Sequence, residues 1–340
     1  MESKINLLVE LNKKHSELFC SQKLERDLYR AKHPTNVVAF KCMDGRIHLP
    51  VITETPLGII SPYRNMGGRF DLGWPLLNVS FDDAVTRAVQ KGARTLVLVT
   101  YHFSKGDVHR GCAGFNYDCG ASKKSTAAFR DQIRRIYGVE NQVVFPVLIG
   151  IETDNDSLIL HGDNEEVVDL AVLNEKDEES LISMIHRLFP NMPERIVSDF
   201  LPIIVGNLNQ IGETKKHKLE AQLVHGEWVL AVGKGFDWLH TPNMAMIVGP
   251  YDPNIGEPIK TAAGIIKSNW ESGRIEKGVV VLASALYGDA ADRAKTQERA
   301  IFMKKLSEDI ITQNYPEMND YMNSIAVVVN SSTMKMEVIE

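Results

Sequence analysis

Short apolar runs alternate with amphipathic segments along the first half of the chain. Residues Asn36–Cys42 and Thr95–Tyr101 are apolar runs bounded by polar turn residues, which is typical of buried strands. Between them, Ser80 is predicted to cap a helix that continues to about Gln90. The apolar face of that helix is predicted to consist of Ala84, Val85, Ala88 and Val89. Strands that alternate with helices favour an α/β layered fold with a largely parallel sheet.

Helical and strand patterns continue on both sides of this region. Residues 1–33 have apolar positions at helical spacing, and a basic helix is predicted over 123–137. The runs Val143–Ile151 and Leu158–Leu160 are separated by a turn sequence and predict a pair of strands. Residues 163–225 are first acidic and then helical, and they are predicted to form a helical connector.

The second half of the chain repeats the pattern of the first. Trp228–Val232 is again an apolar run, and Gly278–Ala283 matches Thr95–Thr100. The closing stretch Ala326–Val338 resembles Leu148–Leu160, with two apolar runs around a turn. Because the matches keep the same order in both halves, the sequence predicts a duplicated domain.

Two further matches follow the first strand of each half. The segment Ser61–Gly68 is matched by Gly249–Gly256. His48 is matched by His240, each in a His-x-Pro sequence. Since both histidines occur at corresponding places, they are interpreted as structural residues.

Composition and charge exclude several classes of protein. The 340 residues carry 38 Lys+Arg against 44 Asp+Glu, a formal net charge of −6, which argues against a surface that coats nucleic acid. No apolar stretch approaches the roughly 18 residues that a membrane span needs. The N-terminus is charged and has no signal-peptide cleavage site, and four cysteines are too few for a disulfide scaffold. A reducing cytoplasm is therefore the expected location.

The candidate chemistry is concentrated in the first half, which contains every cysteine of the chain. Cys42 ends the first predicted strand, and the geometry of an extended chain places Cys42, Asp44 and Arg46 on one face. His102 ends the second predicted strand, at the same edge of the sheet, and Cys112 follows in a loop. Open α/β folds bind their ligands at this edge, so these side chains are expected to converge.

Two thiolates and an imidazole that converge predict a zinc site with an open fourth position, which is typical of catalytic zinc. Such a zinc ion lowers the pKa of bound water to about 7 and supplies hydroxide at neutral pH. Arg46 would hold Asp44 ionised, and Asp44 would either accept the proton of the zinc-bound water or displace that water and close the site. Each of these residues also has a simpler interpretation. A single buried cysteine commonly serves as a small apolar core residue, and an Asp–Arg pair this close in sequence is commonly an ion pair within a turn.

Several motifs taken together resemble the β-class carbonic anhydrases. That family has Cys-x-Asp-x-Arg after its first strand, then an Arg-Asn-x-Gly or Arg-Asn-x-Ala loop. A helix that opens with Ser and leads to Gly comes next, followed by a strand that ends in His with a Cys shortly after. In this chain the motifs are, in order, Cys42–Arg46, Arg64–Gly67, Ser80–Gly92, and Thr95–His102 followed by Cys112. The resemblance covers about residues 34–162.

Two departures from the family pattern affect the site. The family usually has Ser where Gly45 stands, and its His-x-x-Cys spacing is much longer here, between His102 and Cys112. His109 restores the usual spacing, but its distance from the strand end favours His102 as the ligand. Cys119, in a Cys-Gly-Ala sequence similar to that of the family, is the alternative to Cys112. A lengthened loop in a duplicated, half-inactive chain resembles the carboxysomal shell (epsilon-class) carbonic anhydrases, which favours Cys112.

The second copy has lost the residues of this site. When the two halves are aligned by these matches, the positions of Cys42, Asp44, Arg46 and His102 correspond to Lys234, Phe236, Trp238 and Ala285. The resemblance implies that the metal-free half lines the active cleft of the other half.

The implied fold is α/β, with two β-carbonic-anhydrase-like domains fused as a pseudo-dimer, each with a mostly parallel central sheet flanked by helices. The expected parts are an N-terminal helical arm at 1–33, a catalytic zinc-binding domain at 34–162, a helical connector at 163–225 and a degenerate repeat domain without a zinc site at 226–340.

The implied function is that of a zinc lyase that interconverts carbon dioxide and bicarbonate. Zinc on Cys42, His102 and Cys112 would supply hydroxide as the nucleophile, and Asp44 and Arg46 would form the catalytic pair. The alternatives are hydrolysis of carbon disulfide or carbonyl sulfide at the same site, and a non-catalytic zinc-containing shell or scaffold protein. A homo-oligomer of pseudo-dimers is expected. The resemblance also allows a carboxysome as the location, with carboxysome shell or cargo proteins as partners.

Overall fold

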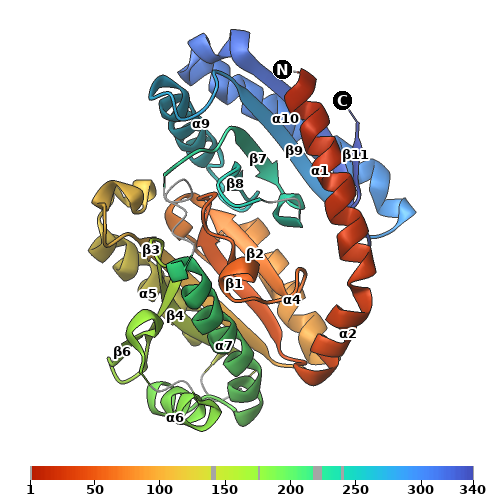
Figure 1. Cartoon of the computed structure of the whole chain (residues 1–340). Helices are drawn as coiled ribbons and strands as arrows, with labels where there is room; N and C mark the ends of the chain where they lie inside the picture. Colours follow the sequence, from red (N-terminus) through yellow and green to blue (C-terminus); the bar gives the residue numbers. More distant parts are fainter. Residues whose placement is uncertain (1, 139–142, 175–176, 217–223, 239–240, 340) are drawn as a thin grey trace.

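The chain folds into two β-sheets flanked by helices, as seen in a computed structural model (Figure 1). The structure describes residues 2–138, 143–174, 177–216, 224–238 and 241–339. None of the helices in these ranges is long and apolar enough to cross a bilayer. His240, which was predicted to be structural, lies outside the described residues.

The first sheet has six strands in the order β2-β1-β3-β4-β5-β6. The strands are β1 (Asn36–Cys42), β2 (Ile60–Asn65), β3 (Thr95–Phe103), β4 (Val144–Glu152), β5 (Ser157–His161) and β6 (Val167–Asp169). The four strands from β2 to β4 in this order are parallel, and β5 and β6 are antiparallel to their neighbours. The predicted strand at 36–42, the predicted strand that ends near His102 and the predicted strand pair are thereby confirmed.

The second sheet has five strands in the order β8-β7-β9-β10-β11. They are β7 (Val229–Gly233), β8 (Ala245–Val248), β9 (Val279–Tyr287), β10 (Met322–Asn330) and β11 (Met336–Val338). Read in chain order, this arrangement is the same as β2-β1-β3-β4-β5 of the first sheet, with parallel strands closed by one antiparallel strand. The predicted fold class, two similar α/β domains in one chain, is confirmed.

The strand register corrects two of the predicted correspondences. Val38 of β1 pairs with Ser61 of β2, whereas Leu230 of β7 pairs with Met246 of β8, so Ser61 corresponds to Met246 instead of Gly249. Val37 of β1 pairs with Leu96 of β3, whereas Val229 of β7 pairs with Val280 of β9. The true match between β3 and β9 is therefore shifted by one position from the predicted one, and His102 corresponds to Leu286 instead of Ala285. The apolar repeat in these strands looks nearly the same after such a shift, and only the hydrogen-bonded partners fix the register.

The helices cover both sheets. They are α1 (Glu2–Ser21), α2 (Lys23–Lys32), α3 (Leu49–Ile52), α4 (Pro75–Gln90), α5 (Cys119–Tyr137), α6 (Glu178–Leu188), α7 (Glu194–Lys216), α9 (Gly256–Glu271) and α10 (Ala290–Asn314). Helix α1 lies along the second sheet (Figure 1). Its Leu8 and Phe19 belong to the apolar core of that sheet, and Asn12 exchanges hydrogen bonds with Met334 and Met336.

The prediction for α4 was wrong at its start and on part of its face. The helix begins at Pro75, and Ser80 lies inside it. Proline fits the first turn of a helix because its fixed φ suits the turn and its missing N–H has no partner there. The buried face consists of Leu77, Phe81, Val85 and Ala88, whereas the side chain of Val89 is 48% exposed.

The segment between the sheets contains more than helices. Besides α6 and α7, it provides strand β6 at the edge of the first sheet. Helix α7 buries Phe200, Ile204 and Leu208 in one continuous apolar core with the first sheet. Asn207 of α7 donates to the carbonyl oxygens of Ile52 and Asp156.

The two halves meet where β8 approaches the segment after β1. The amide of Ile247 donates to the carbonyl of Met43 at 2.9 Å, and the amide of Gly249 donates to that of Arg64 at 3.0 Å. The ring centres of Tyr63 and Tyr251 lie 4.9 Å apart across this boundary. Because β1 carries the predicted site at this end, the boundary between the halves passes beside the site.

Candidate metal centre

Three of the predicted ligands lie together at the carboxyl edge of the first sheet. The ligand atoms of Cys42, His102 and Cys112 all lie within 4.8 Å of one another, and all three side chains are buried. The two sulfur atoms are 3.9 Å apart. The hydrogen bond between these thiols lowers the pKa of Cys42 and raises that of Cys112, so the pair has one proton that is easily lost and one that is held.

The surroundings of His102 are those of a candidate metal ligand. Both of its ring nitrogens are buried, and neither has a hydrogen-bond partner among the described residues. An imidazole buried without a partner is costly, because it has given up its hydrogen bonds to water. Two thiols and one such imidazole in contact suit a transition metal ion, and these residues therefore fit a metal site.

The long loop between His102 and Cys112 is built around Asp154, which lies in the turn between β4 and β5. The hydroxyl of Ser104 donates to Asp154 at 2.8 Å, and the amide of Gly106 donates to it at 2.7 Å. Burial would raise the pKa of Asp154, but these hydrogen bonds outweigh it and lower that pKa. The loop thus has a fixed path that returns Cys112 to the sheet edge.

The alternative ligands lie elsewhere. His109 is in a short 3-10 turn (Val108–Arg110), and its ring packs against that of Tyr117 at 5.2 Å. Cys119 is the first residue of α5, and burial raises the pKa of its thiol. Neither residue is part of a group of metal-binding side chains in the portion of the chain that the structure describes.

Asp44 and Arg46 form a bidentate ion pair beside the two thiols. The guanidinium donates to Oδ1 of Asp44 at 3.0 Å and to Oδ2 at 2.6 Å, and the Arg46 amide donates to Oδ1 at 2.8 Å. Burial by itself would raise the pKa of Asp44, but the charges of Arg46 and His225 hold that pKa well below its usual range. Asp44 is therefore an ionised, oriented acceptor whose Oδ2 lies 3.8 Å from Nε2 of His102.

His225 and Glu227, which sequence reasoning missed, complete the surroundings of Asp44. Nε2 of His225 lies 3.9 Å from Oδ2 of Asp44, and its Nδ1 lies 3.0 Å from Glu227. Burial would lower the pKa of His225, but the charges of Glu227 and Asp44 outweigh burial and raise it. Both residues are far in sequence from the recognised motifs, and no local pattern marks them.

Gly45 departs from the expected Ser for a steric reason. A Cβ atom at this position would lie 2.6 Å from the carbonyl oxygen of Ala245 and 2.8 Å from Cγ of Glu227. Both neighbours belong to the second half of the chain. The fusion of the two halves therefore requires a glycine within the Cys-x-Asp-x-Arg motif.

Arg64 links the Cys-x-Asp-x-Arg motif to the second half of the chain through hydrogen bonds. Its guanidinium donates to the carbonyl oxygens of Asp44 at 3.0 Å and Ile47 at 2.8 Å, and to the carboxylate of Asp237 at 2.7 Å. Lys41 lies 3.6 Å from the same carboxylate, and burial lowers its pKa to about 7. His48 is buried in this cluster, and burial and the nearby cations lower its pKa to about 3.

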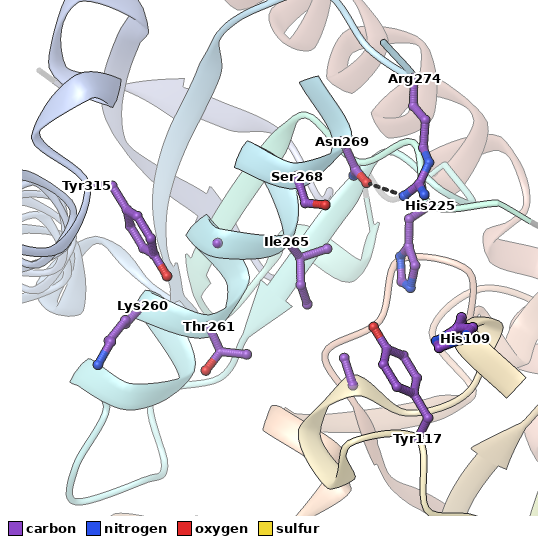
Figure 2. A pocket seen from close by; sticks show the side chains of 12 residues that line it. His109, Tyr117, His225, Lys260, Thr261, Ile265, Ser268, Asn269, Arg274 and Tyr315 are labelled. Atoms are coloured by element: carbon purple, nitrogen blue, oxygen red, sulfur yellow. Dashed lines mark hydrogen bonds between the residues drawn. The ribbon is translucent and has the colours of Figure 1, made fainter. Parts of the chain in front are cut away.

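A cavity of about 530 Å³ opens beside the site. His225 points into it, with Tyr117 and His109 on one side and α9 on the other (Figure 2). The wall from α9 includes Lys260, Thr261, Gly264, Ile265, Ser268 and Asn269. Both halves of the chain thus line one cavity, and His225, which lines it, lies 3.9 Å from Asp44.

The sheet edge of the second half is different. Lys234 follows β7 where Cys42 ends β1, and Leu286 of β9 corresponds to His102. Within the described ranges, no group of potential metal ligands lies at this edge.

Comparison with known proteins finds a family whose match covers the part of the chain that contains this site. Residues 35–182 match the family described as the catalytic domain of the carboxysome shell carbonic anhydrase. A comparison of the chain with curated proteins finds no match. The matched residues include Cys42, Asp44, Arg46, His102 and Cys112. Over residues 35–182, therefore, the chain is similar to the catalytic domain of the carboxysome shell carbonic anhydrase.

Proposed function

We propose that this chain catalyses the reversible hydration of carbon dioxide to bicarbonate, with one zinc ion held by Cys42, His102 and Cys112. The observation that carries the proposal is the buried His102 ring, without a hydrogen-bond partner among the described residues, in contact with two thiols and next to an ionised Asp44. Zinc bound there supplies the Lewis acid that makes a nucleophile of water near neutral pH.

Asp44 is proposed to orient the reacting groups. Three hydrogen bonds from Arg46 fix the carboxylate and keep it ionised, so Asp44 can only accept a hydrogen bond. A water molecule next to Asp44 would donate its proton there and direct a lone pair at carbon dioxide. The same acceptor would bind the hydroxyl of bicarbonate in the reverse direction.

His225 is proposed to carry the proton between the site and solvent. Hydration of carbon dioxide releases one proton per turnover, and that proton has to leave a buried site. His225 lies between Asp44 and the cavity, and its second ring nitrogen is held by Glu227. Histidine is suited to this task because its pKa lies near physiological pH.

The test is stopped-flow carbon dioxide hydration by the purified chain, with metal content measured on the same samples. We expect one zinc ion per chain and fast hydration. Cys42→Ser should lose both, because a neutral hydroxyl is a much poorer zinc ligand than a thiolate. Cys20→Ser is the matched control, since Cys20 is exposed on α1, and it should change neither. A zinc-loaded protein without hydration activity would refute the proposal.

We further propose that the chain works in a carboxysome, as a homo-oligomer, with shell or cargo proteins as partners. The support is the name of the matched family, which is that of a carboxysome shell enzyme. Light scattering gives the mass of the oligomer. A fluorescent fusion should form puncta with a labelled shell protein, and a uniformly distributed signal would argue against this location.

A further inference from the structure

A second cavity, of about 230 Å³, lies at the carboxyl edge of the second sheet. It is lined by Lys234, Leu286 and Tyr251 from the second half and by Arg64 and Arg87 from the first. The cavity thus occupies the place in the second half that corresponds to the metal site in the first, with Lys234 at the position of Cys42.

Among the described residues, the amine of Lys234 has no acidic partner. It lies 3.4 Å from the hydroxyl oxygen of Ser80 and 5.1 Å from the ring centre of Tyr251. No carboxylate in the described ranges lies within 4.0 Å of it. Asp237 also lines the cavity, but its carboxylate is bound by Arg64 and Lys41.

The surroundings of Lys234 disfavour a positive charge. Burial lowers the pKa of this amine, and the charges of Arg299 and Arg87 lower it further, whereas Asp83 acts in the opposite direction. Asp83 is itself paired with Arg87. The ring of Tyr251, 5.1 Å away, favours an ammonium ion and opposes these effects. An amine that faces open space and whose positive charge is disfavoured reacts more readily as a nucleophile, and carbon dioxide is a small electrophile that reacts with amines.

We propose that Lys234 reversibly takes up carbon dioxide as a carbamate. The lone pair of Nζ forms a bond to the carbon, one C–O π pair moves onto oxygen, and the nitrogen releases one proton to solvent. The amine of Lys234 thereby becomes a negatively charged carbamate. Arg87 and Arg299 favour that anion for the same reason that they disfavour the ammonium ion. The step needs only dissolved carbon dioxide, so it does not depend on turnover at the metal site.

Lys41 provides a comparison within the same chain. It is also buried with a lowered pKa, but it lies 3.6 Å from Asp237. The cavity beside it is only about 10 Å³, whereas that beside Lys234 is about 230 Å³. A carbamate at Lys41 would place an anion against a carboxylate in a space too small for it. Lys234 should therefore react and Lys41 should not.

The experiment is chemical trapping of carbamates on the full chain. The protein is equilibrated with isotopically labelled carbon dioxide and bicarbonate, alkylated with triethyloxonium ion, digested and analysed by mass spectrometry. We expect a labelled carbamate on the peptide of Lys234. We expect none at Lys41 and none above background at Lys124, which is exposed on helix α5. Lys234→Arg removes the nucleophilic amine but keeps a long basic side chain, and it should abolish the labelled signal at this position.

Absence of label at Lys234, or label equal to that at Lys124, would overturn the proposal. The outcome is independent of the proposed function, because trapping requires no catalysis. Hydration activity, measured on the same preparation, reports separately on the metal site. The Cys42→Ser variant should remain labelled at Lys234 while it loses hydration activity.

Discussion

Nε2 of His225 lies 3.9 Å from Oδ2 of Asp44, although strands β2 to β6 and helices α6 and α7 lie between the two residues in sequence. Glu227 holds the other ring nitrogen at 3.0 Å. The chain that leads from α7 to β7 therefore delivers a histidine to the carboxylate that Arg46 keeps ionised. In this arrangement the second half contributes to the site through residues that precede its own first strand.

His225→Ala should lower the maximal rate of carbon dioxide hydration at low buffer concentration, by about a hundredfold, since it removes the proposed proton carrier. Zinc content should be unchanged, because His225 is not among the three proposed ligands. Imidazole added as a buffer should restore much of the rate. His109→Ala is the control, as it lines the same cavity without touching Asp44. Equal rates for the wild type and His225→Ala in dilute buffer would refute this role.

His102→Ala should lose zinc and all hydration activity, because two thiols alone leave the ion short of ligands. His109→Ala should keep both. The measurement is the zinc-to-protein ratio after dialysis against metal-free buffer, followed by the hydration assay. If His109→Ala loses the metal and His102→Ala keeps it, the ligands have been assigned in reverse. Full occupancy in both variants would mean that another residue supplies the imidazole.

Asp44→Asn should bind zinc and lose about a hundredfold or more in turnover, because an amide cannot accept the proton that the ionised carboxylate accepts. The change also removes the bidentate ion pair of Arg46 with Asp44, so some stability is lost. Thermal melting of the zinc-loaded variant separates the two effects, since a folded, metal-bound and inactive protein is the expected result. Undiminished turnover would remove Asp44 from the mechanism.

The proposed metal ligands could be located from the sequence because their positions follow from strand geometry. Cys42 and His102 both end apolar runs, and the carboxyl ends of neighbouring parallel strands meet at one edge of a sheet. Cys112 was harder to place, since a loop of this length can return anywhere. What fixes it is Asp154, which binds the loop at Ser104 and Gly106 from the opposite turn. Those contacts join residues that are far apart in sequence, so no periodic pattern in the sequence indicates them.

Other features could not be predicted because they depend on how the halves dock. His225 and Glu227 belong to no motif and become important only because β8 brings the second half against the first. The same contact explains Gly45, whose missing Cβ leaves room for the carbonyl of Ala245. Pro75 is a local signal for the start of α4 and competes with Ser80, which lies inside the helix. The correspondence of His102 with Leu286 needed the hydrogen-bonded register.

Asp237→Asn should destabilise the protein, by about 2–4 kcal/mol, because it leaves Arg64 and Lys41 buried without their shared counter-ion. Since Arg64 also holds the carbonyl oxygens of Asp44 and Ile47, weaker zinc binding should accompany the loss. Urea denaturation and competition with a zinc chelator measure the two effects. Glu271→Gln breaks an exposed ion pair with Lys267 and should leave stability nearly unchanged. Similar results for both variants would contradict a structural role for Asp237.

Asp156→Asn should stabilise the protein at neutral pH but not in acid. Burial raises the pKa of Asp156 from 3.8 to about 6, even though Gln210 donates a hydrogen bond to it at 3.3 Å. Between these two pH values the folded protein keeps a proton that the unfolded chain releases. The stability contributed by Asp156 is therefore full below pH 3.8 and is lost as the pH rises through 6.

An asparagine at this position carries no charge at any pH and tolerates the left-handed backbone, φ 54°, of the native turn. We expect the free energy of unfolding to increase by about 1–2 kcal/mol above pH 6. This is less than the pKa shift alone would give, because the side chain is partly exposed. Urea denaturation of the wild type and the variant at pH 4.5 and 7.5 measures the difference. The stabilisation should be present at the higher pH and almost absent at the lower one. An equal gain at both would show that the effect comes from the turn conformation, since that term does not change with protonation.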